Sequence, residues 1–509
     1  MSPPPAQLPD PYARIAELEA LLAGRDLLID KLRAQIAKLR RLQFGRSSEK
    51  LTRELGQLEL ALEELEAAEE MLAAQRPTSA TRERPPAVRA WPKHLPRVEV
   101  VHEPASGSCT CPSCGGALRR LGADDDEQLD VVRVTWRVVR NVRPKYSCRT
   151  CETVVQAPAP AKPIERGRAT FATLAHVAVA KYDHHLPLYR QAEMMAAQGV
   201  EIDRSTLARM IGQAASLLDP VVSRIREVGL AATKLHVDDT PVPVLDPGTG
   251  RCATGRIWTH VVDDRGFGSN GPVLAWYRFT PDRSGKHCQA ELAGFAGHLQ
   301  ADAYVGYDKL YETGRVIEVP CWGHFRRKIF DEHTSKPTAL TTQILEKIGA
   351  IYAIEAEVRG QPPDARRAAR QTKTKPIVDE LKAILDDAQR RLSPSGDMAK
   401  AIAYGTKRWE RFCRFLDDGR LEIDNLAAER SLRGLAIGRR NWLFAGSQAG
   451  AIRAAAIYTV IETAKLNGLE PEAYLADVME KIASGWPASR WDEIMPWNWR
   501  PAEPLAEAA

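Results

Sequence analysis

Apolar residues near the start of the chain recur at alternating steps of three and four positions, which is the spacing of a coiled-coil seam. One seam covers residues 15–39 and a second covers 51–72. Gly45 and the serines after it interrupt the pattern, so one helix ends there and another begins. Seams this regular bury little surface without a partner. We therefore expect residues 1–75 to form coiled-coil helices that hold copies of the chain together, with a solvated amphipathic hairpin as the alternative.

A linker and two pairs of cysteines come next. Residues 76–105 hold six prolines and scattered arginines, which is the composition of a linker. In residues 106–160, two Cys-x-x-Cys pairs can bind one tetrahedral Zn²⁺, because each pair turns tightly enough to present both sulfurs to the same ion. Four buried thiols are the alternative, and Cys109 is an additional candidate ligand. The predicted zinc ligands are Cys111, Cys114, Cys148 and Cys151.

Between these cysteine pairs the pattern changes to that of exposed strands. Residues 131–142 alternate apolar and basic side chains, and Arg143 and Lys145 follow directly. A zinc ribbon with a cationic strand face is suited to contact the phosphates of DNA.

The segment 161–230 is helical by its apolar spacing. Within it, a helix ending near Ala197, a short turn, and a helix that Asp203 or Ser205 can cap resemble a helix-turn-helix. Such a unit would place Arg204 and Arg209 in a DNA groove. A plain helical hairpin is the alternative.

From residue 231 the pattern is one of strands separated by turn signals. We expect strands at 234–237, 257–262, 273–279 and 298–301, a helix before the fourth strand, and helices after it. That order is typical of a ribonuclease H-like α/β core. The core would occupy residues 231–331 and 416–468, with a helical insertion at 332–415 and a C-terminal tail element at 469–509.

Three acidic residues stand at informative places in this core. Asp238 and Asp302 each end an apolar run, and Glu429 lies in a helical, basic stretch. Two aspartates at strand ends and a helical glutamate can hold two Mg²⁺ ions for in-line attack at a phosphodiester. The three acids therefore predict metal-dependent chemistry on a polynucleotide.

Composition narrows the class of protein. The chain has 509 residues, of which 44% are hydrophobic and 27% charged, as in soluble globular proteins of several domains. The net charge of +5 is modest, so DNA binding must come from local basic clusters. No stretch approaches the roughly 18 apolar residues of a membrane helix, and the Pro-rich start is unlike a signal peptide. Nine mostly scattered cysteines suit a reducing compartment. We expect a cytoplasmic protein with no membrane partner.

Five stretches carry a specific resemblance to a known family: residues 236–245, 299–307, 321–328, 424–433 and 438–446. They closely resemble the DDE transposases of the insertion-sequence 66 family, and the resemblance extends over nearly the whole chain, including the cysteine pairs. It implies a transposase that binds the inverted-repeat ends of its element, cleaves them with Mg²⁺, and joins the freed 3′ hydroxyls to target DNA.

The resemblance also assigns roles to residues. The family's acids fall on Asp238, Asp302 and Glu429, which would hold two Mg²⁺ ions per active site. Strand alternation directs Asp239 to the opposite face from Asp238, so we rank it below Asp238. One departure is Leu426, which stands where the family usually has a second asparagine after Asn425.

Basic residues complete the expected site. His324, Arg327 and Lys328 are expected near the scissile phosphate, where cations stabilise developing charge; for His324 with Cys321, a second metal site or a packed core pair remains the alternative. Further contacts to the DNA backbone, or else a solvated helix face, are expected of four arginines: Arg430, Arg433, Arg439 and Arg440.

Three functions remain open from the sequence: an active transposase, a DNA-binding protein that has lost strand transfer, and a ribonuclease H-like nuclease. The intact acidic triplet argues against the second. The expected partners are double-stranded DNA at the element ends and at the target, further copies of the chain, and accessory proteins. At least a dimer is expected on DNA, because two ends need two active sites.

Overall fold

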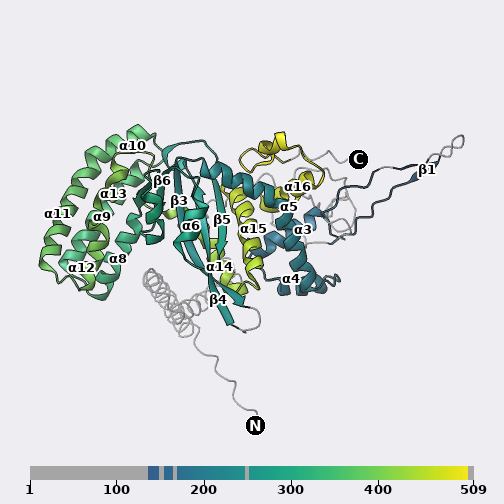
Figure 1. Ribbon diagram of the computed structural model, residues 1–509, viewed down its shortest axis with the longest axis horizontal. Coiled ribbons are helices and arrows are strands. Elements are labelled where there is room, and N and C mark those ends of the chain that lie inside the picture. The colour runs from purple at the N-terminus through teal and green to yellow at the C-terminus, as the bar shows by residue number, and fades with distance from the viewer. Residues whose placement is uncertain (1–135, 148–153, 157, 164–168, 247–250, 502–509) are drawn as a thin grey trace, which may run out of the picture. The chain divides into compact units, whose positions relative to one another are not determined.

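The computed structural model of the chain describes residues 136–147, 154–156, 158–163, 169–246 and 251–501 (Figure 1). The chain divides into two compact units, Met1–Val138 and Val139–Ala509, and almost all described residues belong to the second. The predicted coiled-coil helices, the linker and the four predicted zinc ligands lie outside the described residues. In the predicted ribbon, β1 (Lys145–Ser147) and β2 (Val154–Gln156) pair as an antiparallel hairpin, whereas the described residues 136–142 of the predicted exposed strands form no strand.

Helices fill the segment before the sheet, as the apolar spacing predicts. They are α3 (Phe171–Tyr182), α4 (Leu188–Ala197) and α5 (Arg204–Leu230). Asp203 is the N-cap residue of α5, although its side chain makes no capping hydrogen bond. The order helix, turn, helix is thus present. The second helix, α5, is 27 residues long in all, and one side of it is buried in the core.

A five-stranded mixed sheet forms the centre of the second unit, with the strand order β5-β4-β3-β6-β7. The first three strands in sequence form an antiparallel meander, and β6 and β7 run parallel to β3. A mixed α/β core, as predicted, is therefore confirmed. The strands are β3 (Lys234–Asp246), β4 (Arg251–Val262), β5 (Leu274–Thr280), β6 (Gly297–Ala301) and β7 (Val316–Pro320).

Two features of the sheet differ from the prediction. Strand β3 continues nine residues beyond Val237, past two prolines, because β4 pairs with it along this length while β6 pairs only with its first three residues. Strand β7 was not predicted. Its central Glu318 breaks the apolar pattern, yet it is buried because it forms ion pairs with Arg408 at 3.3 Å and with Arg411.

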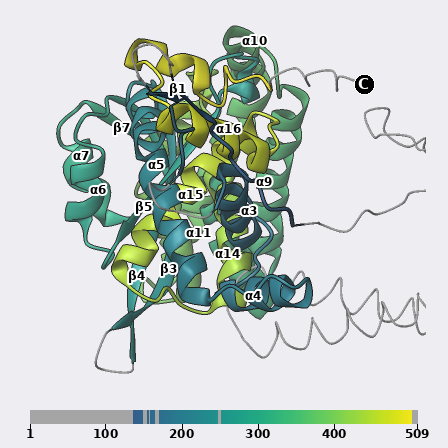
Figure 2. The same ribbon diagram turned by 90° about the vertical axis from the view of Figure 1, so that its right-hand side faces the viewer.

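Helix α15 (Gln448–Leu466) covers the outer edge of β5, and Figures 1 and 2 show it between β5 and α3. Thr463 Oγ1 accepts the N–H of Ala275 at 3.2 Å and donates to its carbonyl at 2.9 Å, while Thr459 Oγ1 accepts the N–H of Tyr277 at 3.0 Å. Two threonines one helical turn apart thus replace the missing neighbour strand and prevent edge pairing with another chain. Beyond α15, the helix α16 (Pro471–Ala483) packs on α3, and a 3₁₀ helix follows, η5 (Ala488–Ile494).

Short helices connect the later strands, and a set of longer ones follows β7. The connecting helices are α6 (Gly285–Glu291), α7 (Asp308–Tyr311) and the 3₁₀ helices η1 (Arg265–Phe267) and η2 (Val305–Tyr307). After β7 come α8 (Trp322–Ser335), α9 (Ala339–Glu357), α10 (Pro363–Ala369), the π-helical η3 (Arg370–Thr374), α11 (Lys375–Arg391), α12 (Asp397–Thr406), α13 (Trp409–Cys413) and the 3₁₀ helix η4 (Arg414–Leu416).

The helices after β7 bury a hydrophobic core of their own. Phe325, Ile348 and Leu381 are fully buried in it, and the indole N–H of Trp322 donates to the carbonyl of Phe412 at 2.9 Å. The chain then returns to the sheet through α14 (Leu426–Trp442), whose Ser431 hydroxyl lies 2.9 Å from Thr259 Oγ1 of β4. In the residues that the structure describes, no helix combines the length and the apolar character needed to span a membrane.

Candidate active site

Asp238 lies on β3, the central strand of the sheet. Its Oδ1 accepts the backbone N–H of Asp239 at 2.8 Å. Burial, together with the negative charges of Asp302, Asp239 and Glu429, raises the pKa of Asp238 to about 7, against the lowering effect of that hydrogen bond. The fold therefore brings the three predicted acids close enough for their charges to interact, although more than 60 residues separate each from the next in sequence.

Asp302 directly follows β6, the parallel neighbour of β3. The parallel register, with His236 opposite Gln300, brings the residues just after β6 level with Asp238, although β3 itself continues further. The carboxylate of Asp302 accepts the N–H of Tyr304 at 3.2 Å through Oδ1 and an N–H of Arg283 at 3.2 Å through Oδ2.

Asp239 is neutralised by two arginines. Its side chain is 3% exposed and accepts hydrogen bonds from Arg256 at 2.9 Å and from Arg283 at 2.9 and 3.0 Å. Arg283 also stacks on the ring of Tyr304, 4.3 Å from its centroid. Asp239 thus anchors Arg283, and Arg283 in turn reaches Asp302. Sequence reasoning did not find Arg283, because nothing in residues 281–285 signals a partner on β3.

Glu429 lies in the first turn of α14, and a buried asparagine fixes the start of that helix. Asn425 Nδ2 donates to the carbonyl of Val237 at 2.8 Å, its Oδ1 lies 3.1 Å from His236 Nδ1, and its N–H donates to Cys321 Sγ at 3.2 Å. These bonds join the start of α14 to the residue before Asp238 and to the N-cap of α8. Leu426, by contrast, is 41% exposed, so the departure at this position leaves the contacts of Asn425 intact.

Asp424 is a further carboxylate at this helix start that sequence reasoning did not assign. Its Oδ1 accepts the N–H of Leu426 at 3.1 Å. Burial, together with the charges of Glu422 and Glu429, raises the pKa of Asp424 to about 6. The helix start therefore adds negative charge next to Glu429.

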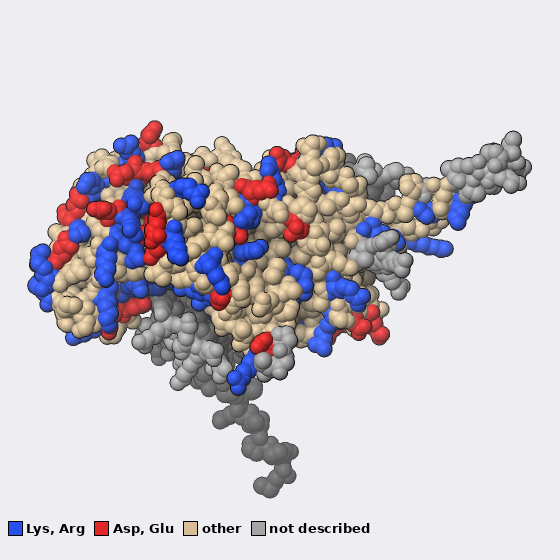
Figure 3. All heavy atoms as spheres, viewed as in Figure 1, with Lys and Arg blue, Asp and Glu red and all other residues tan. Residues whose placement is uncertain are grey.

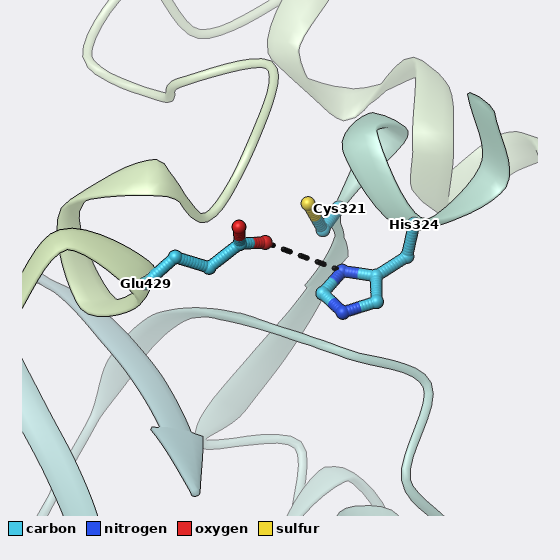
Figure 4. Close-up of side chains that lie close together, drawn as sticks. All are labelled: Cys321, His324 and Glu429. Carbon is cyan, nitrogen blue, oxygen red and sulfur yellow. Dashed lines mark ion pairs between the residues drawn. The ribbon is translucent and has the colours of Figure 1, made fainter. Parts of the chain in front are cut away.

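Cys321, His324 and Glu429 lie together, as Figure 4 shows, with one potential ligand atom from each within 4.8 Å of the others. His324 Nδ1 is 3.9 Å from Glu429 Oε1 and has no hydrogen-bond partner among the described residues. Burial lowers the pKa of His324, which favours the neutral imidazole. Burial also raises the pKa of the Cys321 thiol to about 12, and Cys321 is 1% exposed, so it forms part of the wall behind the site.

The other predicted cations of α8 lie beside this group. Arg327 Nη2 is 3.8 Å from Glu429 Oε2, and the Lys328 ammonium lies over the ring of Tyr404, 4.8 Å from its centroid. Both side chains are exposed. They are therefore available to an anionic ligand that approaches Glu429.

The four predicted arginines of α14 divide into two kinds. Arg430, Arg433 and Arg440 are exposed. Arg439 instead donates to Thr240 Oγ1 at 3.1 Å and to the carbonyl of Pro241, so it ties α14 to β3. Burial lowers the pKa of Arg439. Figure 3 shows Lys and Arg mixed with Asp and Glu over α10 to α12 on the face drawn, in keeping with local clusters rather than one wide basic field.

Arg204 and Arg209 are exposed at the start of α5, and the structure does not bring them to the acids. Arg209 instead lines a hollow of about 490 Å³ together with Arg453 of α15. Sequence reasoning missed Arg453, because its position on a mostly apolar helix carries no signal of a distant partner.

Family models match most of the chain between residues 31 and 497. A model described as "Transposase IS66 family" matches residues 166–453, and one described as "zinc-finger binding domain of transposase IS66" matches 108–152. Models described as "Transposase C of IS166 homeodomain" and "IS66 C-terminal element" match 31–100 and 459–497.

Relatives from Sinorhizobium fredii (strain NBRC 101917 / NGR234) match over nearly the full length. The uncharacterised protein y4hP is 40% identical over 92% of this chain and 89% of its own. The uncharacterised proteins y4jD and y4qI are 39% and 35% identical, over 94% and 97% of this chain and 96% and 94% of their own. With the family model over residues 166–453, these similarities show that the chain belongs to the IS66 family of transposases.

Proposed function

We propose that the protein is a DDE-type DNA transposase that binds the inverted-repeat ends of its element, cleaves them with Mg²⁺ and transfers the freed 3′ ends to target DNA. The observation that carries this proposal is the buried carboxyl of Asp238, which lies within the electrostatic influence of Asp302 and Glu429. The strand order β5-β4-β3-β6-β7, with an antiparallel meander followed by two parallel strands, supports a ribonuclease H-like core.

The donor set fits magnesium. Carboxylate oxygens are the protein ligands that Mg²⁺ prefers, and three carboxylates that repel one another gain from a shared cation. Asp238 and Asp302 would hold the ions, and Glu429 would complete the site. When bound, two Mg²⁺ ions supply a Lewis acid for the phosphodiester and lower the pKa of the attacking water or hydroxyl.

The residues around the acids orient the substrate. Arg327 presents an exposed cation beside Glu429, and Lys328 a second one on the same helix, over Tyr404; both would attract the phosphate. His324 is neutral near pH 7, because burial lowers its pKa, so one ring nitrogen can donate a hydrogen bond to a phosphate oxygen while the other accepts. Asn425 holds the start of α14 against β3 and thereby fixes Glu429 relative to Asp238.

The pKa of Asp238 predicts how stability depends on pH without metal. Its value of about 7 lies above the ordinary 3.8, so the folded state binds this proton more tightly than the unfolded state. The contribution to stability is complete below about pH 4 and is lost as pH rises through about 7, amounting to on the order of 2–4 kcal/mol. Chemical unfolding without divalent ions at about pH 5 and about pH 8 would measure this loss.

Asp238→Asn supplies the control, because its amide keeps the hydrogen bond from Asp239 but cannot ionise. The variant is expected to lack this part of the pH dependence. Added Mg²⁺ should also reduce the loss in the wild type, because the ion stabilises the ionised carboxylate. Equal pH dependence in both proteins would contradict a raised Asp238 pKa.

We further propose that Cys111, Cys114, Cys148 and Cys151 bind one structural Zn²⁺, which the match of residues 108–152 to a zinc-finger model supports. The purified wild type is expected to contain about one zinc per chain, and Cys148→Ser should contain much less, by elemental measurement. Cys252→Ser is the matched control, because Cys252 is an exposed free cysteine on β4. Full zinc content in Cys148→Ser would remove Cys148 from the ligand set.

The domain organisation proposed from the sequence assigns assembly, DNA contact and catalysis to different parts of the chain. Residues 1–75 would assemble copies of the chain, residues 106–160 and 161–230 would contact DNA, and residues 231–468 would hold the catalytic core around the helices of 332–415. Because two ends need two active sites, we propose that at least a dimer acts on DNA, with accessory proteins as further partners.

The experiment for the proposed function is a cleavage and joining assay with purified full-length protein. Labelled linear DNA that carries the terminal inverted repeats of the parent element is incubated with target DNA, with and without Mg²⁺. Joined products that require Mg²⁺ are expected. Cleavage without joining would indicate a nuclease, and tight binding to the ends without chemistry would indicate a DNA-binding protein that has lost strand transfer.

A further inference from the structure

A hollow of about 490 Å³ lies between α5 and α15, away from the acids of the candidate active site. Its lining comes from the first three turns of α5 and from one residue of α15: Ser205, Ala208, Arg209, Gly212, Gln213 and Arg453. A β carbon built at Gly212 would be 3.7 Å from Arg453 Cδ, an ordinary contact distance, so Arg453 packs on this part of α5. The long side chain of Arg453 therefore lies across the glycine and brings its guanidinium to the hollow.

The positive charge at this hollow is not neutralised by an ion pair within the part of the chain that the structure describes. Neither Arg209 nor Arg453 forms an ion pair with any of the described residues, and the same is true of Lys181 on α3. Lys181 is near enough for the charge of Arg453 to act on it: burial, together with that charge, lowers the pKa of Lys181 to about 8. The lining of the hollow thus holds two guanidinium groups and no carboxylate, which favours an anionic ligand.

A second hollow of similar size on the same helix shows the opposite arrangement. It measures about 460 Å³ and is lined by Arg224 of α5 and by residues of η5, among others. There the guanidinium of Arg224 is paired with Glu227 at 3.2 Å and with Asp492 at 3.1 Å. The arginine of the second hollow is thus paired with carboxylates, whereas the arginines of the first hollow form no ion pair with a described residue.

We propose that the hollow between α5 and α15 binds a phosphate group of the DNA backbone, with Arg209 and Arg453 as the principal contacts. Guanidinium groups bind phosphate oxygens through two parallel N–H donors, and the exposed hydroxyl of Ser205 offers a third donor. The inference rests on the proposed function for its ligand, since a transposase must hold its DNA away from the scissile bond as well as at it. Contacts of this kind add affinity and position the duplex without reading its sequence.

The test is the salt dependence of DNA binding by the full-length protein, measured without added divalent metal so that catalysis does not enter. A labelled duplex is titrated at several salt concentrations. Arg453→Gln is expected to weaken binding about 3- to 10-fold at low salt and to reduce the slope of log K against log salt by about 1. The double variant Arg209→Gln/Arg453→Gln is expected to reduce that slope by about 2. An unchanged slope in the double variant would overturn the proposal.

Three further variants separate phosphate binding from damage to the fold. Arg453→Lys keeps the charge and should keep most of the slope, while Arg224→Gln, in the neutralised hollow, should bind DNA as the wild type does. Ser205→Glu places a carboxylate at the hollow, so it should weaken DNA binding. It should not lower the melting temperature, because position 205 is exposed and an acidic residue in the first turn of α5 stabilises the helix. Wild-type binding by Ser205→Glu would also overturn the proposal.

The outcome is distinct from that of the joining assay. If the wild type joins DNA ends but the double variant keeps the wild-type slope, the proposed function is supported and the phosphate site is contradicted. If the variants reduce the slope while the wild type joins nothing, the site stands as a DNA contact and the proposed chemistry falls.

Discussion

Asp238→Asn is expected to reduce DNA cleavage and joining by on the order of 10³-fold or more while leaving DNA binding intact. The amide is nearly isosteric and can still accept the N–H of Asp239, but it cannot supply the negative charge that a Mg²⁺ ligand needs. Asp302→Asn and Glu429→Gln should have the same effect. The measurement is the rate of product formation in Mg²⁺ under single-turnover conditions.

An exposed acid on α8 provides the matched control. Asp331 carries a carboxylate on the same helix as His324 and is exposed, so Asp331→Asn should retain wild-type rates. Binding to the labelled ends should be at least as tight in the three site variants, because each removes a negative charge from a DNA-facing site. More than a tenth of wild-type activity in Asp238→Asn would place the chemistry elsewhere.

Arg370→Met is expected to destabilise the helices after β7 by about 3–5 kcal/mol. Arg370 is fully buried and donates to both carboxylate oxygens of Glu355, at 2.8 and 2.6 Å. It also donates to three backbone carbonyls, those of Phe415 at 2.8 Å, Asp418 at 3.1 Å and Leu421 at 2.9 Å. Its loss leaves a buried carboxylate and three carbonyls short of donors. Unfolding in denaturant measures the effect.

Lys373→Met is the matched control for this prediction, because Lys373 belongs to the same π-helical segment and pairs with Glu357 at 2.8 Å on the surface. An exposed pair of this kind contributes at most about 1 kcal/mol. Replacing Glu355 by leucine in the Arg370→Met background should recover part of the loss, because it removes a buried carboxylate that keeps only the longer ion pair with Arg366, at 3.6 Å, among the described residues. An Arg370→Met protein within about 1 kcal/mol of wild type would show that the network does not support the fold.

The same network links the helices after β7 to the acids. Arg366 donates to both carboxylate oxygens of Glu422, at 3.1 and 3.0 Å, and the buried ammonium of Lys234, at the start of β3, lies 4.0 Å from Glu422. The segment that these groups hold leads directly into Asn425 and α14. The helices after β7 therefore fix the position of Glu429 as well as separating it in sequence from Asp302.

The sequence predicted the elements that local pattern encodes. Asp302 directly follows β6 and Glu429 lies in α14, as predicted. Asp238 lies in the predicted strand but not at its end, because pairing with β4 extends β3 to Asp246. The family similarity predicted from those stretches is confirmed, and so is the mixed α/β core. The zinc ligands and the coiled-coil helices stay predictions, because they lie outside the described residues.

What the sequence did not predict depends on contacts between distant segments. Arg283 reaches Asp239 across 44 positions, Asn425 reaches Val237 across 188, and no local pattern records either pairing. Strand β7 was missed because its buried Glu318 is satisfied by arginines about 90 positions further along the chain. Arg453 was missed for a similar reason, since its neighbour Arg209 lies on another helix.

The most direct measurement is the joining rate of a DNA end whose reacting phosphate carries sulfur in place of one non-bridging oxygen. If Asp238, Asp302 and Glu429 hold metal ions against that phosphate, the sulfur substitution should slow joining by at least about tenfold in Mg²⁺, because Mg²⁺ binds sulfur poorly. Mn²⁺ should restore much of the rate in the wild type but not in Asp238→Asn. Equal slowing in Mg²⁺ and Mn²⁺ for both sulfur isomers would contradict metal contact at the scissile phosphate.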